Sequence, residues 1–238
     1  LEGWFLSVEG YHRSFDGVVT TNFAEDPNTE GDDYLPGTGT SYGADLFLQR
    51  SEGRTTGWIS LSFLRAERSF PDFASGIAPA PLVTYPPIFD RRVDVDLVLR
   101  RDLGRSLELG LRWNFGSGLP FTRPLGSYAY LSPRILPGSG LDWGIGQEED
   151  GEDDPAAYGV ILSERNQARY PPRHRLDVSL RWRVEKGWGV MVPYLSILNV
   201  YNRKNVLFYF FEYEKDPPVR TGISMFPFLP SVGMEVRF

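Results

Sequence analysis

The sequence of 238 residues contains no cysteine and only two histidines. The absence of cysteine excludes a disulfide scaffold, cysteine-ligated zinc, iron–sulfur clusters and a cysteine nucleophile. No apolar run approaches the roughly 18–20 residues that a membrane-spanning helix needs. A helical membrane protein is therefore excluded. A protein that crosses the bilayer with strands is not, because such strands alternate polar and apolar residues.

Basic residues are outnumbered, with 25 Lys and Arg against 31 Asp and Glu and a net charge of −6. This balance argues against a nucleic-acid partner. The mean hydropathy of −0.29 is that of a soluble protein, but it would also average the two faces of membrane strands. The sequence begins at Leu1 without methionine. We therefore expect either that a leader has been removed or that the sequence is a piece of a longer protein.

Alternation of apolar and polar residues is the dominant pattern, and helical periodicity is scarce. The clearest example is 174–185, where Leu176, Val178 and Leu180 alternate with Arg175 and Asp177. Such period-two patterns predict strands with one apolar face. The predicted strands are Trp4–Phe15, Ser41–Arg50, Thr56–Arg65, Arg92–Arg101, Ser106–Phe115, His174–Glu185, Trp188–Asn202 and Phe226–Phe238.

The connections between these segments alternate in length. Tight turns that contain glycine are expected at 51–54, 102–105 and 185–187. Long loops are expected at 16–39, 71–88, 122–173 and 203–225. Short turns at one end and long loops at the other are typical of outer-membrane barrels. With the C-terminus in the periplasm, every long loop falls on the external side.

Three features favour lipid over a soluble core. Arginine, aspartate and glutamate crowd the polar faces of the strands, as in a barrel interior where opposite charges pair. The strands are about ten residues long, enough to cross a bilayer when tilted. Aromatic residues also gather near strand ends, as in interfacial girdles: Trp4, Trp58, Trp113, Trp182, Trp188, Tyr201 and Phe238. A soluble antiparallel sandwich also alternates, and it remains the alternative fold.

Four segments then resemble the C-terminal part of TonB-dependent outer-membrane receptors. Phe115–Thr122 (FGSGLPFT) is similar to a glycine-rich element that ends one of their strands. Asn166 together with Arg169–Asp177 (RYPPRHRLD) is similar to the segment that opens a late strand. Asn199–Asn205 (NVYNRKN) and Pro230–Phe238 (PSVGMEVRF) are similar to the end of the penultimate strand and to the final strand. The resemblance in sequence motifs covers residues 107–238. Residues 1–106 share with the family only the regular spacing of predicted strands.

The resemblance implies an all-β, antiparallel transmembrane barrel with about eight strands in this chain, as part of a larger barrel of about 22 strands. It implies residence in the bacterial outer membrane and energy-coupled uptake of a siderophore, glycan, peptide or cobalamin-like nutrient. Outer-membrane lipid would be one partner, and the barrel-assembly machinery would read Phe238 as the final aromatic residue. A plug domain and a TonB box are absent from this sequence. Contact with TonB would therefore be made by parts of the receptor that this sequence does not contain. The alternative is a self-contained eight-stranded barrel with a structural or adhesive role.

Candidate sites are few, and neither an enzyme nor a bound cofactor is expected. His12 and His174 lie far apart in sequence, and Asp177 faces the opposite side of its strand from His174. The acidic run at 147–154 offers Glu148, Asp150 and Asp153 as weak ligands for a cation, without the spacing of a calcium loop. External-loop tyrosines are the candidates for ligand contact, with aromatic packing as the alternative role: Tyr130, Tyr209 and Tyr213.

Overall fold

The computed structural model describes residues 2–22, 33–72, 77–129, 132–136, 140–144, 158–212 and 219–238. Every regular element in these ranges is a β-strand, and the strands pair antiparallel. The all-β antiparallel class predicted from the sequence is therefore confirmed. Within the described ranges, no helix is long and apolar enough to cross a membrane.

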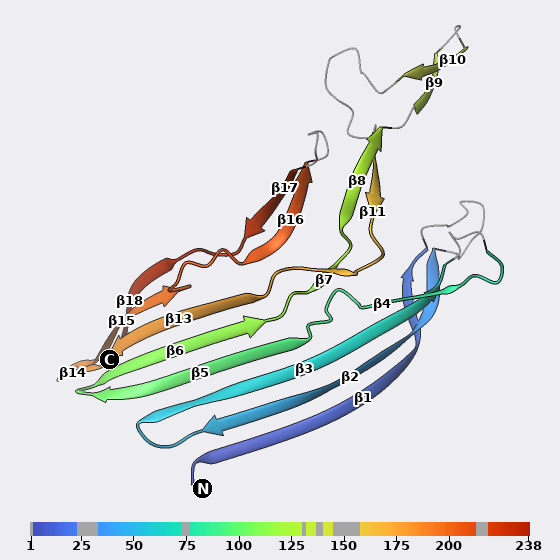
Figure 1. Ribbon diagram of the computed structural model, residues 1–238. Helices are drawn as coiled ribbons and strands as arrows, with labels where there is room; N and C mark the ends of the chain where they lie inside the picture. The colour runs from blue at the N-terminus through green and yellow to red at the C-terminus, as the bar shows by residue number, and fades with distance from the viewer. Residues whose placement is uncertain are drawn as a thin grey trace.

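One 10-stranded sheet dominates the structure (Figure 1). Neighbouring strands follow chain order in the sequence β1, β2, β3, β5, β6, β13 and β15, with β18 on the far side of β15 and β4 beside β3. After a break at Arg183, β14 continues β13 in the same register with β15. The strands are β1 (Trp4–Thr21), β2 (Tyr34–Arg50), β3 (Thr55–Pro71), β4 (Leu82–Tyr85), β5 (Val93–Gly104), β6 (Leu107–Gly116), β13 (Arg173–Trp182), β14 (Val184–Lys186), β15 (Gly189–Leu198) and β18 (Leu229–Arg237).

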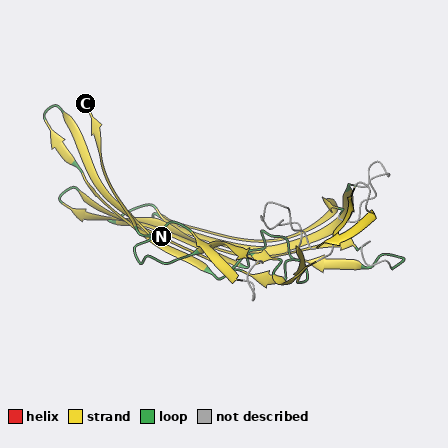
Figure 2. Cartoon of the chain, turned by 90° about the horizontal axis from the view of Figure 1, so that it is seen from above, coloured by secondary structure: helices red, strands yellow, loops and turns green. Residues whose placement is uncertain are grey.

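The sheet is open. In the described part of the chain, β1 pairs only with β2, and β18 pairs only with β15. Viewed from above, the sheet is a curved band whose two edges do not meet (Figure 2). Closure of the eight long strands on themselves, which the sequence permits, is therefore not what these residues form.

Every segment predicted as a strand forms a strand of this sheet, and the predicted turns lie together at one end (Figure 1). We call this end, which also carries both termini, the turn end, and the opposite end the loop end. The turn between β5 and β6 contains Arg105 and Ser106, whose φ angles are 52° and 63°. Two consecutive residues with positive φ match the right-handed twist of the flanking strands. The chain therefore reverses there with non-glycine residues at both central positions.

The strands run further toward the loop end than the sequence predicts. β1 continues to Thr21 and β2 begins at Tyr34, although 16–39 reads as a loop. Alternation is lost there because apolar residues stand next to each other, as Val18 and Val19 do, among Gly and Thr, while the backbone pairing continues. Four two-stranded sheets occupy the other long connections: β7 (Pro120–Phe121) with β12 (Ala168–Arg169), β8 (Pro124–Ala129) with β11 (Tyr158–Leu162), β9 (Ser132–Leu136) with β10 (Gly140–Gly144), and β16 (Val206–Glu212) with β17 (Val219–Ser224).

The sheet has no second layer to bury its apolar residues. Among the described residues, the buried hydrophobic side chains are Ala66, Phe70 and Tyr85. Phe70 and Tyr85 stack with their ring centroids 5.8 Å apart, where β4 joins β3 near the loop end. A soluble domain of this size would bury a sizeable core between layers. The apolar residues of this sheet instead remain on its surface.

Candidate functional site

The strand register places most apolar residues of the sheet on one face, although Phe5, Phe47 and Trp58 pack together on the other. Leu97 of β5 pairs with Ile59 of β3 and with Trp113 of β6, and Trp113 pairs with Leu176 of β13. Leu6 is 61% exposed on β1, Trp182 is 55% exposed on β13 and Val232 is 81% exposed on β18. Soluble monomers rarely expose contiguous apolar patches larger than a few hundred Å². We call this surface the apolar face.

The apolar face has the height of a membrane strand. On β6 it runs from Leu107 to Phe115, a span of about 26 Å at the usual rise of a strand. On β3 it ends toward the loop end where Arg65 and Glu67 follow Phe63 at alternate positions. Arg65 and Glu67 form an exposed ion pair of 2.8 Å. A polar boundary of this kind is expected where a strand leaves hydrocarbon for water.

The opposite face carries charges of both signs, and we call it the charged face. Asp96 of β5 lies opposite Asn114 of β6, which lies opposite Arg175 of β13. The Asn114 amide nitrogen donates to Asp96 over 2.9 Å, and Arg175 is ion-paired with Asp177 at 2.9 Å. The register thus assembles a network of charges that the sequence shows only as alternation.

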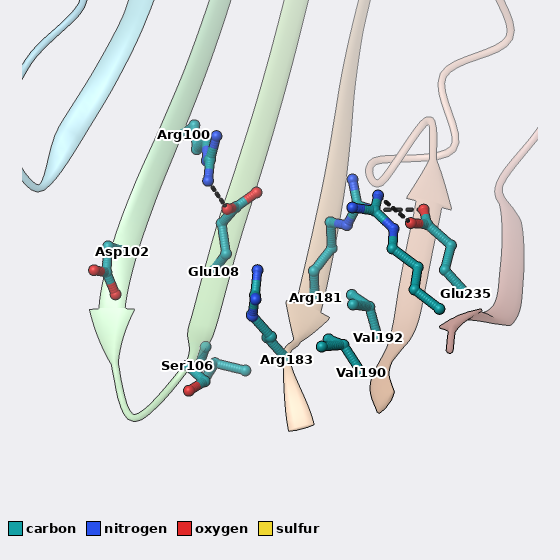
Figure 3. A pocket seen from close by; sticks show the side chains of 11 residues that line it. Arg100, Asp102, Ser106, Glu108, Arg181, Arg183, Val190, Val192 and Glu235 are labelled. Carbon is teal, nitrogen blue, oxygen red and sulfur yellow. Dashed lines mark hydrogen bonds and ion pairs between the residues drawn. The ribbon is translucent and has the colours of Figure 1, made fainter. Parts of the chain in front are cut away.

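At the turn end of the charged face is a hollow of about 550 Å³ (Figure 3). Arg100 of β5 is paired there with Glu108 of β6 at 2.5 Å. Arg181 of β13 reaches across β15 to Glu235 of β18, also at 2.5 Å. One pair joins β5 to β6 and the other joins β13 to β18, and the paired side chains are about a quarter exposed or more, so each pair contributes little stability alone.

Toward the loop end, Asp90 is the centre of a buried network. On the side away from β2, β3 pairs with β5 up to Phe63 and with β4 from Arg68, so this edge has no strand partner in between. Asp90 fills this gap, because its Oδ1 accepts the backbone N–H of Ala66 at 2.8 Å. Its Oδ2 is paired with Arg92 at 2.8 Å and also with Arg169.

Three asparagines of the Asn199–Asn205 segment replace missing backbone partners at the end of β15. Asn199 is fully buried, and its amide donates to the carbonyls of Arg203 and Phe226 at 3.0 and 3.1 Å. The Asn202 Oδ1 accepts the N–H of Phe228 at 2.9 Å. Asn205 bonds both backbone groups of His174, as a paired strand residue would. Asn199 and Asn202 also have φ near +50°, which asparagine tolerates better than most residues.

Asp177 connects this asparagine segment to β13. Its Oδ1 accepts the N–H of Asn199 at 2.9 Å, just beyond the last ladder pair between β13 and β15. Two of the segments that resemble the receptor family, Arg169–Asp177 and Asn199–Asn205, therefore meet through backbone-directed hydrogen bonds. Such bonds fix the exit of the chain from the sheet because buried backbone groups must be paired.

The Gly116-Ser117-Gly118 element ends β6 by close backbone contacts. The Ser117 hydroxyl accepts the N–H of Val93 at 3.0 Å, and its own N–H donates to the Val93 carbonyl. A Cβ on Gly118 would collide with the Tyr170 carbonyl, and one on Gly116 would collide with the Arg91 guanidinium. Gly118 is therefore required by space, because it meets backbone, whereas at Gly116 the neighbour is the end of a flexible side chain.

Tyr209 is the one candidate ligand-contacting residue that lies within the described residues. It stacks on Tyr170 at 5.3 Å and tilts against Phe121 at 5.7 Å, while Arg220 lies 4.4 Å above its ring. These contacts join two connections at the loop end, the one between β6 and β13 and the one between β15 and β18. Contacts of this kind are those of aromatic packing, the role expected from the sequence as the alternative to ligand contact for Tyr209. The other two candidates, Tyr130 and Tyr213, lie outside the described residues.

The described residues form no catalytic or metal site around the remaining candidates, which are the histidines and the acidic run. His174 Nδ1 lies 3.4 Å from the Tyr201 hydroxyl, with no nucleophile in the contact. Glu148, Asp150 and Asp153 lie outside the described residues. Among the residues that the structure describes, no cluster of three or more His, Asp or Glu could hold a metal ion. Phe238, the predicted assembly signal, is fully exposed just after β18.

Sequence reasoning missed Asp90 and the backbone role of Asn205. Asp90 follows a proline-rich stretch with no periodicity, so no local signal marks it. Only folding places Asp90 beside Arg169, which is 79 positions away. Comparisons with models of protein families and with curated proteins give no match for this chain.

Proposed function

We propose that this chain forms part of the wall of an outer-membrane transport barrel of the kind that TonB-dependent receptors use for nutrient uptake. The observation that carries the proposal is a single uncovered sheet with an exposed apolar face and a charged, ion-paired opposite face. Lipid would cover the apolar face, and the charged face would line the lumen. Because the bilayer supplies the apolar surroundings, the sheet needs no second protein layer.

The two free edges favour the wall of a larger barrel over a small one. β1 leaves a row of unpaired backbone groups along 18 residues, and such an edge invites pairing with another strand. A self-contained eight-stranded barrel would pair β1 with β18, which the described sheet does not do. We propose that further strands continue the sheet at both edges and that β18, ending near Phe238, is recognised by the barrel-assembly machinery.

The absence of cysteine provides a direct test of the two faces. Single cysteines would replace Leu61, Leu97 and Leu180 on the apolar face, with matched controls at Ser62, Asp96 and Ser179 on the charged face. Each would carry an environment-sensitive fluorophore in membranes containing doxyl-labelled lipid. We expect blue-shifted, lipid-quenched emission from the first set only. Equal quenching on both faces, or a protein that is monodisperse without detergent, would contradict the membrane assignment.

Transport is tested separately in cells. Accumulation of labelled ferric siderophores, cobalamin and oligosaccharides would be compared between cells with and without the protein. The same comparison would be repeated in cells lacking TonB. We expect uptake of one class to require both the protein and TonB. Uptake that persists without TonB would contradict energy coupling while leaving the membrane topology intact.

A further inference from the structure

Arginines gather on the charged face near the loop end of β6 and β13. Arg112 lies on β6, and Arg173 and Arg175 lie on β13, where they face Gly116 and Asn114. Arg91 lies two residues before β5 and approaches Arg173 beside Gly116. These strands are internal to the sheet, so the cluster is complete without any further strand at either edge.

The nearby carboxylates are already engaged with other groups. Within the described residues, neither Arg112 nor Arg173 has an ion pair or a hydrogen bond to a carboxylate. Asp94 is paired with Arg91 at 3.0 Å, Asp96 accepts from Asn114 at 2.9 Å, and Asp177 is paired with Arg175 at 2.9 Å. The four arginines therefore outnumber the three acids, and Arg173 shares the attraction of Asp94 with Arg91 instead of having a carboxylate of its own.

Arg91 and Arg173 meet over Gly116. The position of a Cβ on Gly116 lies 3.1 Å from Arg173 Nε and closer still to Arg91 Nη1. Both nitrogens are buried without a hydrogen-bond partner. Burial and the neighbouring Arg173 charge lower the pKa of Arg91 below its ordinary value. Unpaired buried donors on like charges are costly, and an anion would relieve the cost.

Arg173, but not Arg91, also lines a hollow of about 220 Å³. Arg112, Arg173 and Arg175 line it together with the polar pair Asp96 and Asn114, and Phe226 contributes an apolar wall. Its volume suits one carboxylate, phosphate or sulfate group rather than a large ligand. Planar guanidinium groups match the oxygens of such anions in geometry and charge.

We propose that this hollow binds a single oxyanion group of a diffusible ligand between Arg112 and Arg173. The inference goes beyond the proposed function, since it needs only the charged face and not a transport lumen. An acidic side chain from another protein segment offers the same chemistry, so the experiment must separate the two sources.

The test titrates inorganic phosphate, and citrate as a carboxylate probe, into the intact protein in detergent, with binding measured by calorimetry at constant ionic strength. We expect saturable binding that Arg112→Gln and Arg173→Gln each weaken by about tenfold or more, since each removes charged hydrogen bonds. Arg173→Lys should weaken binding less than Arg173→Gln, because it keeps the charge. The control is Arg100→Gln, an arginine of the same face at the turn end, which should bind as the original protein does.

Three results would overturn the proposal. One is the absence of saturable binding by either probe, and another is an equal loss in the Arg100→Gln control. The third is a lack of binding combined with lower thermal stability of Arg173→Gln, which would assign the anion to a protein carboxylate. Heat-modifiable electrophoretic migration checks that each variant is folded. The lipid-quenching test is independent of these outcomes, so either proposal can fail alone.

Discussion

Arg169 and Asp90 form an ion pair across 79 positions of sequence. Arg169 also donates to the carbonyls of Asp90 and Gly118, at 2.7 and 3.0 Å. The pair therefore connects β12, the segment before β5 and the end of β6 at one point. Its position at the base of the long connections suggests that it holds them on the sheet.

Replacement of Asp90 by alanine should destabilise the protein strongly. The change leaves the Ala66 N–H without its acceptor and Arg92 and Arg169 without their carboxylate, and breaking a buried charge pair costs about 3–5 kcal/mol. Urea unfolding of the protein in lipid vesicles would measure the loss. Glu185→Ala, which breaks an exposed pair with Arg183, should change stability by less than about 1 kcal/mol. Equal effects of the two changes would contradict the role of Asp90.

Asn199→Ala should also be destabilising, because Asn199 is fully buried and its side chain makes three hydrogen bonds to backbone groups. Leaving a buried backbone group unpaired costs about 1–3 kcal/mol, and the groups that Asn199 bonds are partly buried, so the lower part of this range applies to each. Asn199→Asp should not rescue stability, since a carboxylate would face the two carbonyls of Arg203 and Phe226. The exposed Ser231→Ala change is the control for the same unfolding measurement and should be nearly neutral. A stable Asn199→Asp variant would contradict this geometry.

Gly118→Ala should lower the melting temperature, whereas Gly126→Ala should not. A Cβ at Gly118 meets the Tyr170 backbone, which cannot move without disturbing the Arg169 network, while a Cβ at Gly126 meets nothing within 4 Å. Overpacking of this kind costs about 1–3 kcal/mol. Loss of heat-modifiable migration during a temperature series gives the measurement. If Gly126→Ala were the more damaging change, the close approach at Gly118 would not be the cause.

Tyr209 can be assigned to packing or to ligand contact by two substitutions. Tyr209→Phe keeps the rings stacked against Tyr170 and Phe121, so we expect stability to be unchanged. Tyr209→Ala removes these contacts, each worth about 0.5–1.5 kcal/mol beyond burial, and should loosen the loop end. Proteolysis of the loops in intact cells would report this change. A Tyr209→Phe variant that is stable but fails in ligand uptake would instead support a contact through the hydroxyl.

Much of the fold follows from local sequence. The alternation in 107–115 or 174–182 makes one strand face apolar and the other charged, whichever strand lies beside it. The short turns predicted at 51–54, 102–105 and 185–187 force antiparallel neighbours, so chain order becomes strand order; in the structure the last two are the residue pairs 105–106 and 187–188. The outer parts of β1 and β2 could not be predicted because adjacent apolar residues, such as Val18 and Val19, break the period-two alternation that marks a strand.

The sequence by itself therefore determined the strands, their turns and the two-faced character of the sheet. It also marked the asparagine and glycine segments, through their resemblance to receptors, without assigning them contacts. Only the tertiary structure decided that the sheet stays open, that Asp90 meets Arg169, and that Arg91 and Arg173 share the space over Gly116. The physical reason is range: alternation and turn chemistry act over a few residues, whereas these contacts depend on the register and curvature of the whole sheet.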